Sequence, residues 1–129
     1  MTRSRMLTVS SLLSILLLSI HLSQDTLLEK RGTWPAGPGV LIAIVILVVL
    51  LLGPTLLAGR RSGYIIMLVS GIFALGMPVL HLTGGRFNPD RHSDALLFMW
   101  ILMALGVSGL FSIILAIQSI RGVKVSNIR

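Results

Sequence analysis

The stretch VLIAIVILVVLLLGPTLLA, residues 40–58, decides the fold, because its first thirteen residues carry no polar side chain. At 1.5 Å per residue, a helix over the whole stretch is about 28 Å long, close to the roughly 30 Å of a bilayer's hydrocarbon core. The alternation of polar and apolar residues that a membrane-spanning strand needs is missing. The stretch is therefore predicted to cross a membrane as a helix.

Three further apolar runs resemble it in length: residues 6–23, 64–82 and 95–120. Of the 129 residues, 54% are hydrophobic and only 12% are charged, against about a quarter charged in soluble domains. The connecting segments are short and contain glycine and proline, which favours antiparallel neighbours. The predicted fold is a single domain, residues 1–129: an all-α membrane protein with four transmembrane helices in an up-and-down bundle.

The basic residues predict the orientation of these helices. Seven fall on the side of the two termini (Arg3, Arg5, Arg60, Arg61, Arg121, Lys124 and Arg129), and four fall on the other side (Lys30, Arg31, Arg86 and Arg91). The positive-inside rule then places both termini in the cytoplasm. No small-x-small cleavage site follows the first run, where Ser19-Ile20-His21 stands, so that run is predicted to stay as an anchor.

Small residues predict which helix faces pack together. Residues 95–120 carry four of them at four-residue spacing, and residues 64–82 carry a second stripe; the predicted packing residues are Ala104, Ser108, Ser112, Ala116, Ser70 and Ala74. Small residues allow close approach of helices in lipid, and serine hydroxyls gain nothing there unless they find a partner. Residues 40–52 lack polar atoms and are predicted to face lipid most.

All three histidines and all four acids gather on the side opposite the termini, where they form the candidate site. Ionisable residues in or near a span are costly and therefore candidates for function. In the preferred interpretation Asp25 accepts a hydrogen bond from His21, Asp90 and Asp94 cap the last helix, and His92 is solvated. In the competing hypothesis His21, Asp25, His81 and His92 bind zinc or copper. In a third, His21 and His81 ligate a b-type haem.

Other functions find less support in the sequence. There is no cysteine, which excludes disulfides, thiolate metal sites and cysteine nucleophiles. Neither a Ser-His-Asp elbow nor a phosphate-binding glycine loop is present, and the scattered basic residues do not form a nucleic-acid surface. The leading hypothesis is a non-enzymatic accessory or structural membrane protein, which acts as a homo-oligomer or as a subunit of a larger complex. A metal or haem protein comes second, and a carrier for small solutes is a distant third.

Four segments resemble a group of small, uncharacterised four-span bacterial membrane proteins: HLSQD (21–25), RRSGYIIML (60–68), MPVLHLTG (77–84) and FMWILMALGV (98–107). The resemblance extends over residues 12–118. It implies a four-span architecture and a bacterial origin, hence the inner membrane. It implies no activity and gives no ligand role to His21 or His81.

Overall fold

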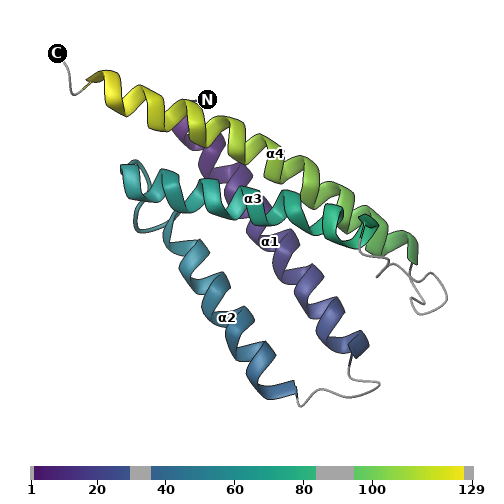
Figure 1. Ribbon diagram of the computed structural model, residues 1–129. Helices are drawn as coiled ribbons and strands as arrows, with labels where there is room; N and C mark the ends of the chain where they lie inside the picture. Colours follow the sequence, from purple (N-terminus) through teal and green to yellow (C-terminus); the bar gives the residue numbers. More distant parts are fainter. Residues whose placement is uncertain (1, 30–35, 84–94, 127–129) are drawn as a thin grey trace.

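The part of the chain that the structure describes folds into four helices, and Figure 1 shows their arrangement. The computed structural model describes the backbone of residues 2–29, 36–83 and 95–126, and the side chains of residues 2–24, 40–83 and 96–122. The helices are α1 (Arg3–Glu29), α2 (Ala36–Leu52), α3 (Arg61–Thr83) and α4 (Ala95–Ser126). Within these ranges no strand is present. The predicted all-helical class is confirmed.

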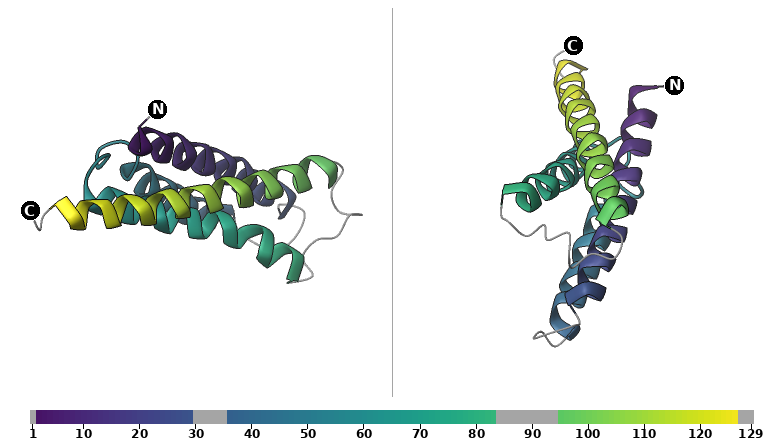
Figure 2. Two further views of the ribbon diagram at one scale, coloured as in Figure 1. Left: turned by 90° about the horizontal axis from the view of Figure 1, so that it is seen from above. Right: turned by 90° about the vertical axis from the view of Figure 1, so that its right-hand side faces the viewer.

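Three of the helices are long and apolar enough to cross a bilayer: residues Arg3–Gln24, Arg61–Thr83 and Leu96–Gly122. The apolar part of α2, Val40–Leu52, is shorter. Successive helices run in opposite directions, so both chain ends and the α2–α3 turn lie at one end of the molecule, as Figures 1 and 2 show. The molecule is therefore compatible with a small membrane protein.

The structure corrects the predicted helix over residues 40–58, because α2 ends six residues earlier, at Leu52. Pro54 has no amide hydrogen to continue the hydrogen-bond ladder, and the amide of Gly53 already bonds to the Leu50 carbonyl (3.3 Å), only three residues back. The chain then turns through Gly59, whose φ of +82° suits glycine. A Cβ on Gly63 would collide with the Leu57 carbonyl, so the turn packs directly on the start of α3.

The core lies where α1, α3 and α4 meet. A Cβ added to Gly109 would lie 2.8 Å from the Gly71 carbonyl oxygen, so the backbones of α3 and α4 touch at this pair. Two apolar clusters fill the space between the helices: Ile15, Leu18, Leu50, Ala74 and Leu105 form one, and Leu7, Tyr64, Met67 and Ala116 form the other. Small residues thus allow the close helix approach that membrane proteins rely on.

Helix α2 stands apart from this core. Leu50 is buried and Leu47 packs beside it, but Leu41, Ile42 and Val45 are each at least 60% exposed. Figure 2 shows α1 and α2 diverging from the α3–α4 pair. The four helices therefore form a three-helix core with α2 at its edge, and the prediction that residues 40–52 face outward most agrees with their exposure.

Candidate functional site

The structure brings two of the four predicted ligand residues together. The rings of His21, near the end of α1, and His81, in the last turn of α3, have centroids 4.8 Å apart at an interplanar angle of 78°. His21 is fully buried and His81 is 9% exposed. These two residues are called the histidine pair below. They meet because α1 and α3 run in the same direction, so that their ends lie at one depth.

Phe98, from the first turn of α4, packs against both rings. Its ring centroid lies 5.4 Å from that of His21 and 5.5 Å from that of His81, and its side chain is buried. Aromatic rings at such distances attract each other in tilted or edge-to-face arrangements. Phe98 therefore shields the histidine pair on one side, and sequence reasoning missed it because an apolar residue in an apolar helix carries no distinguishing signal.

A backbone contact orients one ring of the pair. His81 Nδ1 lies 3.0 Å from the carbonyl oxygen of Met77, one turn earlier in α3. If Nδ1 carries the hydrogen and donates it, Nε2 is left with its lone pair. Metal-binding histidines are commonly held in this way, with the second ring nitrogen on a carbonyl.

The side chains of the other two predicted ligands, Asp25 and His92, are not among those that the structure describes. Asp25 belongs to α1, but its side chain is outside the described residues, and His92 is outside them entirely. Among the described side chains, no group of three or more histidines or acids could hold a metal ion. Gln24, three residues after His21, has a buried Oε1 without a hydrogen-bond partner in the part of the chain that the structure describes.

The ring spacing distinguishes between the two kinds of metal group that the sequence suggested. With zinc–nitrogen bonds of about 2.0–2.1 Å, two imidazole centroids on one tetrahedral ion lie about 5 Å apart. Two axial histidines of a haem iron lie on opposite sides of the porphyrin, with centroids about 6 Å apart. The observed 4.8 Å fits a shared single ion and leaves no room for a haem between the rings.

A second polar group lies in the middle of the α1–α4 contact. This serine cluster consists of Ser10, Ser14, Ser108 and Ser112. Ser14 Oγ donates to Ser108 Oγ (3.0 Å), and the hydroxyls of Ser10 and Ser112 are 2.9 Å apart. The sequence predicts inward-facing serines on both helices, Ser10 and Ser14 on α1 and Ser108 and Ser112 on α4, but spacing along one helix does not reveal that the two stripes face each other.

The other predicted packing residues also lie inward. Ser70, Ala74 and Ala116 are buried, whereas Ala104 is only half-buried. Ser11 and Ser70 differ from the serine cluster: within the described residues, neither buried hydroxyl has a hydrogen-bond partner. The buried hydroxyls between the helices are therefore of two kinds: those of the serine cluster are hydrogen-bonded, and those of Ser11 and Ser70 have no partner among the described residues.

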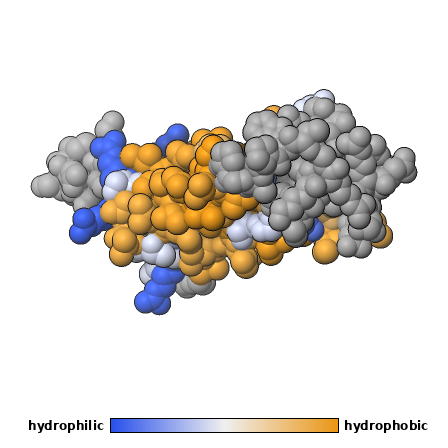
Figure 3. All heavy atoms as spheres, turned by 90° about the horizontal axis from the view of Figure 1, so that it is seen from below, coloured by the Kyte–Doolittle hydropathy of each residue, from blue (hydrophilic) through white to orange (hydrophobic). Residues whose placement is uncertain are grey.

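The opposite end of the molecule is basic. Every charged side chain that the structure describes is an arginine near this end: Arg3, Arg5, Arg60, Arg61 and Arg121, called the arginine end. All five are exposed. Figure 3 shows hydrophilic residues near the end of the chain termini and a broad apolar surface beside them.

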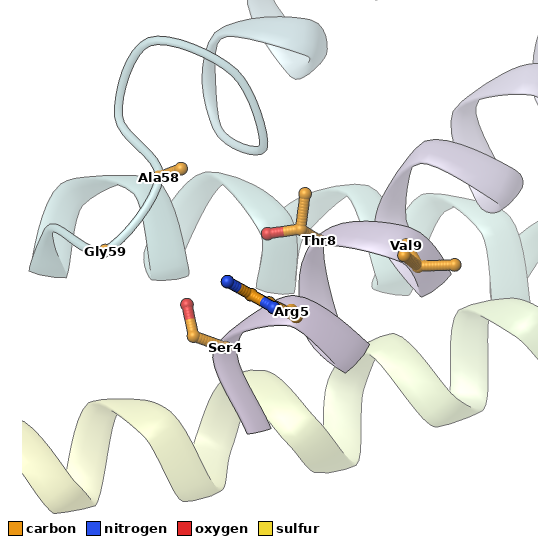
Figure 4. A pocket seen from close by; sticks show the side chains of 6 residues that line it. All are labelled: Ser4, Arg5, Thr8, Val9, Ala58 and Gly59. Carbon is orange, nitrogen blue, oxygen red and sulfur yellow. The ribbon is translucent and has the colours of Figure 1, made fainter. Parts of the chain in front are cut away.

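An open groove lies at the arginine end, between the start of α1 and the α2–α3 turn. Its volume is about 420 Å³, and its lining residues are Ser4, Arg5, Thr8, Val9, Ala58 and Gly59. Figure 4 shows the hydroxyls of Ser4 and Thr8 and the guanidinium of Arg5 around one space. Arg5 is the charged residue of this lining, and none of the six lining residues is an acid.

Comparison with protein-family models, with curated proteins and with solved structures finds no match to this chain.

Proposed function

We propose that this protein is a non-enzymatic accessory or structural protein of a bacterial inner membrane, with both termini in the cytoplasm. The observation that carries the proposal is the distribution of its exposed side chains. Large apolar side chains are exposed along all four helices, from Leu16 on α1 to Phe111 on α4. In water such a surface would aggregate, whereas in lipid it is the expected exterior.

The arginine end supports the cytoplasmic orientation. Basic residues that flank membrane spans accumulate on the cytoplasmic side, where they also attract anionic lipid headgroups. Seven of the eleven basic residues of the sequence fall on this side, and five of them belong to the part of the chain that the structure describes. We assign that end, with both chain termini, to the cytoplasm, and the histidine pair to the outer half of the bilayer.

The interior favours an accessory role over a carrier. Proton-coupled carriers place an acid or a lysine within the membrane. Among the described side chains, the buried polar ones are serines and the histidine pair, and none is an acid, a lysine or an arginine. Protein–protein contacts within the membrane, with a second copy or with another subunit, then remain as the means of action.

Extraction followed by native-mass measurement tests this proposal. The protein is expected to stay in the membrane pellet at alkaline pH and to dissolve only in detergent. In mild detergent it should run as an oligomer or with a second protein in constant ratio. A monomer of 13.9 kDa without a stoichiometric partner would contradict the accessory role.

A further inference from the structure

We propose that the histidine pair is a binding site for one transition-metal ion of the zinc or copper type. The site is formed by one imidazole nitrogen from each of His21 and His81, with Gln24 Oε1 or water completing the coordination. This site is independent of the accessory role, because neither the exposed apolar surface nor the arginine end contributes to it.

The distance between the rings is the first argument. An ion that binds both imidazoles at about 2.0–2.1 Å holds their centroids about 3.2 Å from itself. At an angle near 100° between the two bonds, the centroids are then about 4.9 Å apart, close to the observed 4.8 Å. The 78° between the ring planes is compatible with a tetrahedral ion, which does not require parallel ligand rings.

The surroundings of the rings are the second argument. The Met77 carbonyl oxygen lies 3.0 Å from His81 Nδ1 and so fixes the orientation of that ring, as a backbone carbonyl commonly does for a metal-binding histidine. Phe98 covers both rings and is only 2% exposed, so it restricts water on that side. Apolar packing around paired imidazoles is typical of a metal site that controls solvent access.

Gln24 supplies the third argument. Its Oε1 is buried and has no hydrogen-bond partner among the described residues. Residues three apart on a helix are neighbours on its surface, so Gln24 lies one turn beyond His21. A buried oxygen without a partner costs free energy, and a bound cation would satisfy it. Imidazole nitrogens with an oxygen are ligands that suit zinc and copper.

Metal titration of the full chain in mild detergent tests this proposal. Chelator-treated protein is titrated with Zn²⁺, and separately with Cu²⁺ and with Cu⁺ under reducing conditions, in competition with a chromophoric chelator. We expect one ion per chain for at least one of the three. Because each substitution removes a ligand, His21→Phe and His81→Phe should each weaken binding about 100-fold or more, while keeping an aromatic ring in place.

Phe98→Leu is the matched control, because it changes the packing around the rings and leaves both imidazoles. It should bind the ion within about 5-fold of the original protein, since it removes no ligand. Equal binding by the His21→Phe, His81→Phe double variant and the original protein would overturn the proposal. So would the absence of stoichiometric binding of all three ions.

X-ray absorption of the metal-loaded original protein covers the case in which the variants do not fold. Two imidazoles at about 2.0 Å should give the outer-shell scattering of two rings. A first shell of oxygen atoms without imidazole scattering would show that the ion lies elsewhere, and the histidine pair would then be an aromatic packing contact with Phe98.

Discussion

Replacement of Gly109 by alanine should destabilise the contact between α3 and α4. The added Cβ would lie 2.8 Å from the Gly71 carbonyl oxygen, 2.8 Å from the Leu75 amide nitrogen and 2.9 Å from the Ala74 Cβ. The first two contacts are about 0.6 Å shorter than the 3.4 Å at which ordinary van der Waals contact begins. Two are with backbone atoms and the third is with a short side chain, so only a movement of the helices can relieve them.

The magnitude follows from the cost of overpacking. Inserting a methyl group into a closely packed contact costs about 1–3 kcal/mol. Alanine is also a better helix former than glycine by up to about 1 kcal/mol, which would hide part of this cost. Gly122→Ala, on the same helix with nothing within 4 Å of its added Cβ, is the matched control because it gains the same propensity without a clash. Gly109→Ala should therefore be about 1–3 kcal/mol less stable than Gly122→Ala.

Reversible unfolding in mixed micelles of mild detergent and dodecyl sulfate measures this difference. Gly71→Ala provides a second test, because its Cβ would lie 2.9 Å from the Gly109 carbonyl oxygen, and Gly76→Ala is its control on α3, with nothing within 4 Å. Equal stability of Gly109→Ala and Gly122→Ala would refute the argument that the two backbones touch at this crossing.

Three further predictions concern the interior and the α2–α3 turn. Ser14→Ala removes a hydrogen bond between helices and should lower the free energy of unfolding by about 0.5–1.5 kcal/mol in the same assay. Ser119→Ala loses only a bond within α4 and should lower it less; the opposite order would contradict the role of the serine cluster. Ser11→Ala and Ser70→Ala each remove a buried hydroxyl that has no partner among the described residues, so the free energy of unfolding should stay unchanged or rise by up to about 1 kcal/mol. A decrease of more than about 1 kcal/mol would show that the hydroxyl is bonded. Gly63→Ala should lower the yield of folded, monodisperse protein, because its Cβ would collide with the Leu57 carbonyl, and a normal yield would mean that the turn does not pack on α3 as described.

The helices could be predicted from the sequence because apolar length alone identifies a span. The runs 6–23, 64–82 and 95–120 all lie within helices of the structure. The end of α2 could not be predicted as well, since apolar residues continue through Leu56 and Leu57 after the helix has stopped. Hydropathy does not detect that Pro54 interrupts the hydrogen bonds there.

The candidate site, too, could be predicted from the sequence only in part. The common depth of His21 and His81 follows from the alternating helix directions, so sequence reasoning could place them at one end. Their contact at 4.8 Å depends on how α1 and α3 rotate about their axes, and neighbouring helices determine that rotation. Phe98 and Met77 complete the site through an apolar ring and a backbone carbonyl, which no sequence motif reveals. The roles of Asp25 and His92 stay predictions, since their side chains lie outside the described residues.

The most direct test of the account labels the two ends of α3 from outside the cell. The chain contains no cysteine, so single variants at Ser62 and Thr83, both exposed and at opposite ends of this helix, each carry one reactive thiol. In intact bacterial cells with a permeable outer membrane, a membrane-impermeant maleimide should label Thr83→Cys and should label Ser62→Cys only after lysis. Labelling of Ser62→Cys alone would reverse the orientation, and equal labelling of both before lysis would contradict a helix that crosses the membrane.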